Sequence, residues 1–335
     1  MNLLAHRFHG AQRQAIGPLL LATIAVVIPS WTASPGLPAG PVSEQHVAPE
    51  AAEGVESLVR RDHRVQFEDA ELHTWEVSLE APDGHARPVV FFLHGGTWSG
   101  RPNFDLRYGD YSTMERFARA GWRTFAFDAR GYGLSSDPDG AHWSEAKDTV
   151  RDLHAVVTHL LEGHDVSRVS FVGWSWGSQV AALFAQQYPD LTGRVVLYGT
   201  RWKAFEDAPD APEDRMRTNT LDDAKSDFVD GCFEPALMEA YAKAAFAADP
   251  ASPNGVFRDY FVNLPIIDPK RLQAPTLLIA GEHEAAQTLE DLQALFAALP
   301  TPDRQLAIIP GGGHAVHLEK GRHRWYSTVM SFLRE

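Results

Sequence analysis

The sequence places a serine, Ser175, between two tryptophans and two glycines in the segment Gly173-Trp-Ser-Trp-Gly177. The preceding residues from Val169 favour a β-strand, and a helical pattern follows the segment directly. Gly-x-Ser-x-Gly at such a junction is typical of a nucleophile elbow, in which the serine lies on a sharp turn between strand and helix. The glycines leave room that side chains would fill. The pattern therefore predicts Ser175 as a nucleophile.

A serine hydroxyl is a weak nucleophile at neutral pH and needs a neighbouring base. Of the 15 histidines, His314 stands out because it ends a glycine-rich segment, Pro-Gly-Gly-Gly-His, directly after the last predicted core strand. Such a segment can bend back over the carboxyl edge of the sheet, where ligands bind in open α/β folds. We predict His314 as the base. The alternative, His317, has the position of a residue that packs under the final helix.

The base in turn needs a carboxylate that orients it and stabilises the imidazolium. Glu282 and Glu284 both follow the strand before the one that leads to His314. An acid at the end of the preceding strand, such as Glu206 or Asp207, is the alternative. The order nucleophile, acid, histidine along the chain differs from the orders of the classical serine proteases.

The elements that would position these side chains alternate between strands and helices, which predicts an α/β fold with a mostly parallel sheet and helices on both faces. The rhythm breaks over about 70 residues after Gly199, too long for a structureless loop, and we predict an inserted helical cap there. The expected division is a core of residues 55–200 and 268–335 and a cap of residues 201–267. The predicted strands are 65–67, 75–79, 89–93, 123–127, 169–172, 195–198 and the segments around 274–282 and 304–309; the predicted helices are 111–120, 144–162, 179–188, 287–299 and 320–333.

Four motifs together resemble those of the α/β-hydrolase superfamily, over roughly residues 64–333. In the superfamily the acid usually stands at the fourth position of a Gly-Glu-x-Asp turn, and the resemblance implies that Glu284 fills this role with one extra methylene group. The matching motifs are His-Gly-Gly at 94–96, Asp-Ala-Arg-Gly-Tyr-Gly-Leu-Ser at 128–135, the Ser175 pentapeptide, and Pro-Gly-Gly-Gly-His at 310–314.

The resemblance also implies an oxyanion hole formed by the backbone N–H groups of Trp176 and Gly96. It implies a structural role for Asp128 and Arg130, which would brace the loop near the nucleophile. Two further tryptophans, Trp98 and Trp174, are expected to form an apolar wall of the substrate pocket.

Composition excludes several other classes of function. The 30 Lys and Arg residues against 44 Asp and Glu give a net charge of −14, which disfavours nucleic acid as a partner. The single cysteine, Cys232, excludes an intrachain disulfide and Cys-rich metal or redox motifs. Many acids fall in the cap, where we expect a solvated acidic face or, alternatively, a carboxylate that holds a substrate ammonium group: Glu206, Asp207, Asp210, Glu213, Asp214, Asp222, Asp223, Asp227 and Asp230.

The N-terminal segment has the composition of an export signal. Arg7 and Arg13 precede an apolar stretch from Ala15 to Pro29, and a stretch rich in Pro, Gly and Ser follows. The apolar stretch is shorter than the about 20 residues of a membrane span. We expect residues 1–40 to be a signal peptide with a linker. The protein would then be exported (periplasmic or extracellular), with no stable membrane insertion after cleavage. A retained N-terminal anchor and a wrongly assigned start codon are the alternatives.

The function that these residues favour is hydrolysis of a carboxylic ester or related acyl bond in a small molecule, with no metal or organic cofactor. The sequence also resembles the proline-iminopeptidase branch of the superfamily, although that branch usually has His-Gly-Gly-Pro-Gly where this chain has His-Gly-Gly-Thr-Trp-Ser-Gly. Aminopeptidase or amidase activity is therefore an alternative, as are C–C bond hydrolysis, acyl transfer and a non-catalytic binding role. The oligomeric state stays open.

Overall fold

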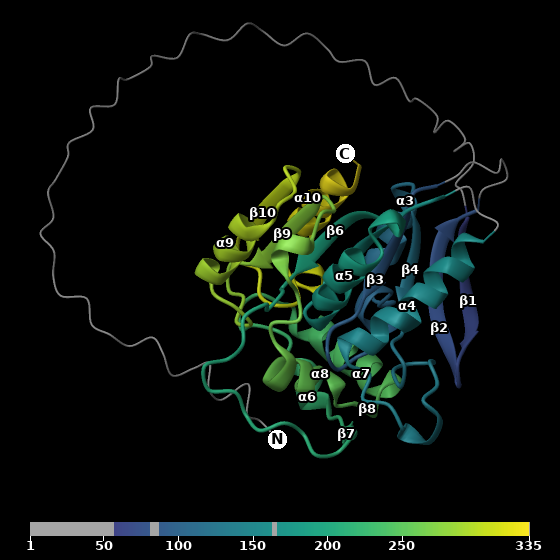
Figure 1. Ribbon diagram of the computed structural model, residues 1–335. Helices are drawn as coiled ribbons and strands as arrows, with labels where there is room; N and C mark the ends of the chain where they lie inside the picture. Colours follow the sequence, from purple (N-terminus) through teal and green to yellow (C-terminus); the bar gives the residue numbers. More distant parts are fainter. Residues whose placement is uncertain (1–56, 81–86, 163–165, 335) are drawn as a thin grey trace, which may run out of the picture. The chain divides into compact units, whose positions relative to one another are not determined.

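The central element of the fold is an eight-stranded sheet (Figure 1). The structure is a computed structural model that describes residues 57–80, 87–162 and 166–334. The strand order is β1-β2-β4-β3-β5-β6-β9-β10. The strands are β1 Leu58–Phe67, β2 Ala70–Leu79, β3 Val89–Leu93, β4 Arg123–Phe127, β5 Val169–Trp174, β6 Thr192–Tyr198, β9 Thr276–Gly281 and β10 Arg304–Ile309.

The sheet is parallel from β4 to β10, because β3 pairs in parallel with β4 and β5, and β6 pairs in parallel with β5 and β9. β10 adds to β9 in the same direction. The antiparallel pairs are β1 with β2 and β2 with β4. The predicted α/β-hydrolase architecture, a mostly parallel sheet with flanking helices, is confirmed.

Helices cover both faces of the sheet. One hydrophobic cluster joins α4, α5 and α9 to one face, and a second joins α3 and α10 to the other. In β3, alternation divides the side chains between them: Phe91 belongs to the first cluster and Phe92 to the second. The helices are α2 Gly100–Phe104, α3 Thr113–Arg119, α4 Ala146–Leu161, α5 Trp176–Gln187, α9 Leu289–Ala298 and α10 Arg322–Arg334, with 3₁₀ turns at Pro138–Gly140, Pro189–Leu191, Pro269–Arg271 and Val316–Leu318.

The segment between β6 and β9 contains short helices and a two-stranded antiparallel sheet, which gather beside one another in Figure 1. We call residues 201–267 the cap. Its boundaries stay a prediction, because core and cap belong to one compact unit, Glu56–Glu335. The cap elements are β7 Met216–Thr218, α6 Leu221–Lys225, α7 Pro235–Ala248, β8 Ala251–Pro253, α8 Gly255–Arg258 and a π-helical turn, η3, at Asp259–Asn263.

The start of α4 differs from the prediction. The helix predicted from residue 144 has Glu145 as its N-cap, and the Ser144 hydroxyl donates to the carbonyl oxygen of Arg130. Ser144 has a φ of 55°, a left-handed conformation that the turn before the helix requires.

The predicted signal peptide, residues 1–40, lies outside the described residues. In the part of the chain that the structure describes, no helix is both long and apolar enough to cross a membrane.

Candidate active site

Ser175 lies on the sharp turn between β5 and α5. Its φ of 54° and ψ of −120° are strained for a residue with a side chain. The close packing of the turn explains the two glycines. A Cβ atom at Gly173 would lie 2.3 Å from the carbonyl oxygen of Gly177, and one at Gly177 would lie 2.3 Å from that of Leu93. The segment therefore has the geometry of a nucleophile elbow, and the Ser175 side chain is partly exposed.

The two predicted oxyanion residues lie at the start of α5 and in the loop after β3, where the Cβ position of Gly95 is 3.5 Å from Cβ of Ser175. Trp176 is the first residue of α5, so its N–H has no partner within the helix. Gly96 follows β3, and a Cβ atom there would lie 2.5 Å from Cγ2 of Val256 in the cap. The absence of a side chain at Gly96 thus lets α8 pack against this loop. The Gly96 carbonyl oxygen accepts a hydrogen bond from the Tyr132 hydroxyl at 2.9 Å, which fixes the loop from the core side.

His314 and Glu284 form a close pair at the ends of β10 and β9. Nδ1 of His314 lies 2.8 Å from Oε1 and 2.9 Å from Oε2 of Glu284. The histidine side chain is 17% exposed and the glutamate 4%. Burial opposes a charge on the ring, but the negative charge of Glu284 and its hydrogen bond outweigh burial and raise the pKa of His314 to about 9. The pair therefore stabilises an imidazolium at this position.

Buried polar contacts hold the loop that carries His314. Its carbonyl oxygen accepts hydrogen bonds from Nε1 of Trp174 at 2.9 Å and from the hydroxyl of Tyr198 at 2.8 Å. The carboxylate of Glu319 accepts from the backbone N–H groups of Gly313 and Ala315. These contacts fix the backbone on both sides of the histidine, so its ring keeps its place beside Glu284.

The same edge of the sheet brings the elbow next to this pair. The Ser175 N–H donates to the carbonyl oxygen of Tyr198 at 2.8 Å, and the next residue, Gly199, has its Cβ position 3.1 Å from the His314 ring and 2.9 Å from Oε2 of Glu284. Among the described residues, the hydrogen-bond partner of the Ser175 hydroxyl is Tyr260, at 3.2 Å, and not His314. Hydrogen bonds between nucleophile and base often tighten only when substrate binds.

Comparison with protein families shows which family the chain belongs to. The model of the serine aminopeptidase S33 family matches residues 84–321, which include the elbow, Glu284 and His314. The chain belongs to this family of α/β-hydrolases.

Relatives of this hydrolase differ in the activities that their names give. A relative described as "Probable proline iminopeptidase" from Leptolyngbya boryana is 26% identical over 286 residues, which cover 70% of this chain and 83% of the relative. The structure is similar to that of 2-hydroxy-6-oxo-6-phenylhexa-2,4-dienoate hydrolase from Rhodococcus, with a TM-score of 0.63, 17% identity and coverage of 83% and 100%. An esterase from Exiguobacterium antarcticum has a TM-score of 0.61, 15% identity and coverage of 81% and 99%. The structural likenesses show the fold alone.

The alternative acids and base of the hydrolase lie elsewhere. Glu282 is exposed and accepts the backbone N–H of Gly311 at 2.9 Å. Glu206 and Asp207 are exposed in the cap. His317 is wholly buried, and its Nε2 lies 3.1 Å from the carbonyl oxygen of Asn103. Burial lowers the pKa of His317 to about 3, so this ring is a neutral packing residue.

The two tryptophans predicted to line the pocket are both 2% exposed. Trp174 packs against the His314 ring, with 5.4 Å between the ring centroids. A place for Trp98 and Trp174 in a substrate pocket stays a prediction.

Asp128 accepts hydrogen bonds from the backbone N–H groups of Gly100 and Leu134, and Arg130 pairs with Asp152, as expected of residues that brace this loop.

Two buried cap aspartates that the sequence did not single out connect the cap to the loops after β3 and β4 and to the start of α5. Asp249 accepts hydrogen bonds from the backbone N–H of Ser99 at 2.8 Å, from its hydroxyl at 2.7 Å and from the N–H of Gly133 at 2.7 Å. Asp259 accepts the indole N–H of Trp176 at 2.7 Å. Burial raises the pKa of each carboxyl to about 6. No local pattern marks these residues, because their partners come from distant parts of the chain.

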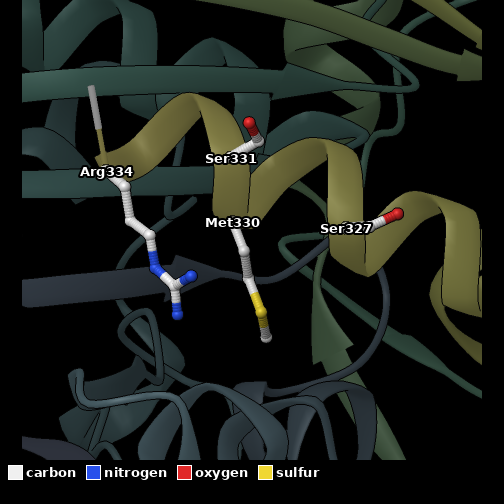
Figure 2. A pocket seen from close by; sticks show the side chains of 4 residues that line it. All are labelled: Ser327, Met330, Ser331 and Arg334. Atoms are coloured by element: carbon white, nitrogen blue, oxygen red, sulfur yellow. The ribbon is translucent and has the colours of Figure 1, made fainter.

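Two surface grooves lie away from this site. One, of about 480 Å³, is lined by residues of α10: Ser327, Met330, Ser331 and Arg334 (Figure 2). The other, of about 520 Å³, lies between α3 and α10. Neither is lined by Ser175, Glu284 or His314.

Within residues 57–80, 87–162 and 166–334, no group of His, Cys, Asp and Glu side chains has an arrangement that could hold a metal ion.

Proposed function

We propose that the chain is a serine hydrolase that cleaves the acyl bond of a small carboxylic ester through Ser175, His314 and Glu284. The observation that carries the proposal is the contact of His314 Nδ1 with both oxygens of Glu284, next to a serine on a strained elbow. The contact leaves the other ring nitrogen of His314 to exchange a proton with the serine.

The reaction follows from these positions. Ser175 Oγ forms a bond to the acyl carbon while the neutral form of His314, whose population grows as the pH rises toward the pKa of about 9, takes the hydroxyl proton. The N–H groups of Trp176 and Gly96 hold the negative oxygen. The C–O bond to the leaving alcohol then breaks, and the alcohol receives the proton from His314. A water molecule, deprotonated by the same imidazole, releases the acid and restores the Ser175 hydroxyl.

A fluorophosphonate probe and a panel of p-nitrophenyl esters test the proposal. We expect covalent labelling of the wild-type protein at Ser175, hydrolysis of short-chain esters, and loss of both in Ser175→Ala. A protein that neither reacts with the probe nor cleaves any ester or amide would have a binding role instead.

A second candidate, cleavage after an amino acid with a free α-amino group, is favoured by Asp227 of the cap. Its carboxylate accepts a hydrogen bond from the Tyr241 hydroxyl at 3.2 Å. Burial raises the pKa of Asp227 to about 6, and the charge of His314 acts in the opposite direction. At neutral pH the group is thus largely a carboxylate that interacts with the catalytic histidine, a suitable place for a substrate ammonium group. Several relatives are named proline iminopeptidase.

Asp227→Asn separates the two candidates. If the substrate carries an ammonium group at this position, we expect kcat/KM for prolyl and alanyl p-nitroanilides to fall by about 10-fold or more, since an ion pair at a partly buried site is lost. Neutral p-nitrophenyl esters should react at nearly the wild-type rate. Asp222→Asn, an exposed acid of the same cap, is the control. Equal losses for both substrate types would rule out ammonium recognition by Asp227.

A further inference from the structure

Tyr260, a cap residue, is the hydrogen-bond partner of the nucleophile among the described residues. Its hydroxyl lies 3.2 Å from Oγ of Ser175, and its ring packs against the hydrophobic core. The residue belongs to the π-helical turn η3 that follows α8. Nothing in the steps proposed above uses this hydroxyl, although it touches the atom that attacks the substrate.

The segment that carries Tyr260 also contacts both residues of the predicted oxyanion hole. Val256 packs where a Cβ atom of Gly96 would otherwise lie, at 2.5 Å. Asp259 accepts the indole N–H of Trp176 at 2.7 Å. One short stretch of the cap is thus fixed to Gly96 and Trp176 while the next side chain reaches Ser175. The Tyr260 hydroxyl is therefore carried by a segment that packs against the two residues whose N–H groups are predicted to bind the oxyanion.

The turn around Tyr260 is itself firmly anchored. Besides Trp176, the Asp259 carboxylate accepts the backbone N–H of Ala146 at 2.7 Å and the side-chain amide of Asn263 at 2.9 Å. Asp259 is 2% exposed. A donor held by its neighbours in this way needs little reorganisation when charge develops, which is the condition for strong electrostatic stabilisation.

The hydroxyl of Tyr260 also keeps its proton under all ordinary conditions. Burial raises the pKa of this phenol, and the negative charges of Asp259 and Glu284 raise it further. The group is therefore a neutral O–H donor rather than a base that could compete with His314 for the serine proton.

We propose that Tyr260 is a catalytic residue whose hydroxyl is a third donor to the oxyanion, beside the N–H groups of Trp176 and Gly96. The inference rests on the proposed acyl hydrolysis. In the free enzyme the phenol pairs with Ser175 Oγ. When Oγ bonds to the acyl carbon and its proton passes to His314, the phenol O–H turns to the carbonyl oxygen that becomes negative. No proton leaves Tyr260, and the hydrogen bond is released when the carbonyl re-forms.

Tyr260→Phe tests this role, with kcat and KM measured for a p-nitrophenyl ester and an ethyl ester of the same acid. Loss of one oxyanion donor lowers kcat by about 10²–10³-fold, and we expect a fall of about 100-fold for both esters with little change in KM. The equal factor is diagnostic, because a donor to the leaving group would matter for ethanol and hardly for p-nitrophenolate.

Tyr188→Phe is the matched control. Tyr188 lies at the opposite end of α5 from Ser175, 13 residues away, or about 20 Å along the helix. We expect its kcat to equal that of the wild type. Thermal unfolding of both variants gives the folded fraction at the assay temperature, by which kcat is corrected.

Three results would overturn the assignment: unchanged kcat in Tyr260→Phe, a loss confined to KM, or a loss confined to the ethyl ester. Failure of the proposed function itself is separate, since it appears in the wild type as absence of Ser175 labelling and of ester hydrolysis.

Discussion

The acid that contacts His314 is a glutamate, one methylene group longer than the aspartate usual at this position in the superfamily. The longer side chain presents both carboxylate oxygens to Nδ1, at 2.8 and 2.9 Å. Glu284 keeps part of this loop in place as well, because its Oε1 accepts the backbone N–H of Ala286 at 2.8 Å. The same carboxylate thus orients the base and is oriented by its own turn.

Replacement of this acid by its amide should abolish most activity. In Glu284→Gln we expect kcat to fall by about 10⁴-fold, since a neutral amide cannot stabilise the imidazolium and holds the ring less well in the required tautomer. Steady-state kinetics on p-nitrophenyl esters measures the effect. Glu282→Gln, two residues away and exposed, should keep full activity. Near-normal turnover in Glu284→Gln would transfer the role to another acid.

At the scale of secondary-structure elements, the buried strands were predictable and the short elements were not. The predicted bounds of β3 and β4 agree with the structure, because an apolar run buried on both faces has few alternatives. The five-residue α2 and the three-residue β7 and β8 have too few residues for a periodic pattern. Tyr260 was missed for a related reason: only the tertiary fold of the cap brings its hydroxyl to Ser175.

The backbone is closely packed at the junction of β5 and α5, so an alanine in place of a glycine there should destabilise the protein. In Gly177→Ala the new methyl group would lie 2.3 Å from the Leu93 carbonyl oxygen and 2.5 Å from that of His94. We expect a loss of about 3 kcal/mol in the free energy of unfolding. Denaturant titration measures it.

The control for this prediction is Gly231→Ala. Gly231 has a φ of 85° and no atom within 4 Å of its Cβ position, so only the left-handed conformation penalises alanine, by about 1–2 kcal/mol. A loss in Gly177→Ala no larger than in this control would contradict the steric argument.

For the molecule as a whole, the net charge of −14 gives a poor picture of where the acids lie. The sequence predicted a solvated acidic face on the cap, and Glu206, Asp207 and Asp222 are indeed exposed. Asp249 and Asp259, in contrast, are 1% and 2% exposed and hold the cap on the core. Composition assigns acids to a surface on average, whereas the partners that bury particular ones are set by the fold.

The stability of the whole protein should depend on pH through His314. Burial disfavours the charged ring, but Glu284 raises its pKa from 6.5 to about 9, so the folded state binds this proton more tightly than the unfolded chain. The stabilisation is complete below pH 6.5 and is lost as the pH rises through about 9. We therefore expect the melting temperature to fall between these pH values.

His314→Gln should show a smaller fall over the same range, because the amide carries no titrating proton. Calorimetry at matched ionic strength measures both proteins. Identical falls in the variant and the wild type would show that other groups set the pH dependence.

The aspartate links between cap and core have a consequence for protein engineering. Residues 201–267 grafted onto another hydrolase would bring Asp249 and Asp259, but not Ser99, Gly133, Trp176 and Ala146, whose hydrogens they accept. Each carboxylate that stays buried without these donors would lower the stability of the chimaera by about 1–3 kcal/mol or more. A chimaera that folds would therefore need the segments of this chain that carry Ser99, Gly133, Trp176 and Ala146 together with the cap. The cap of this protein can be moved only with the core segments that it contacts.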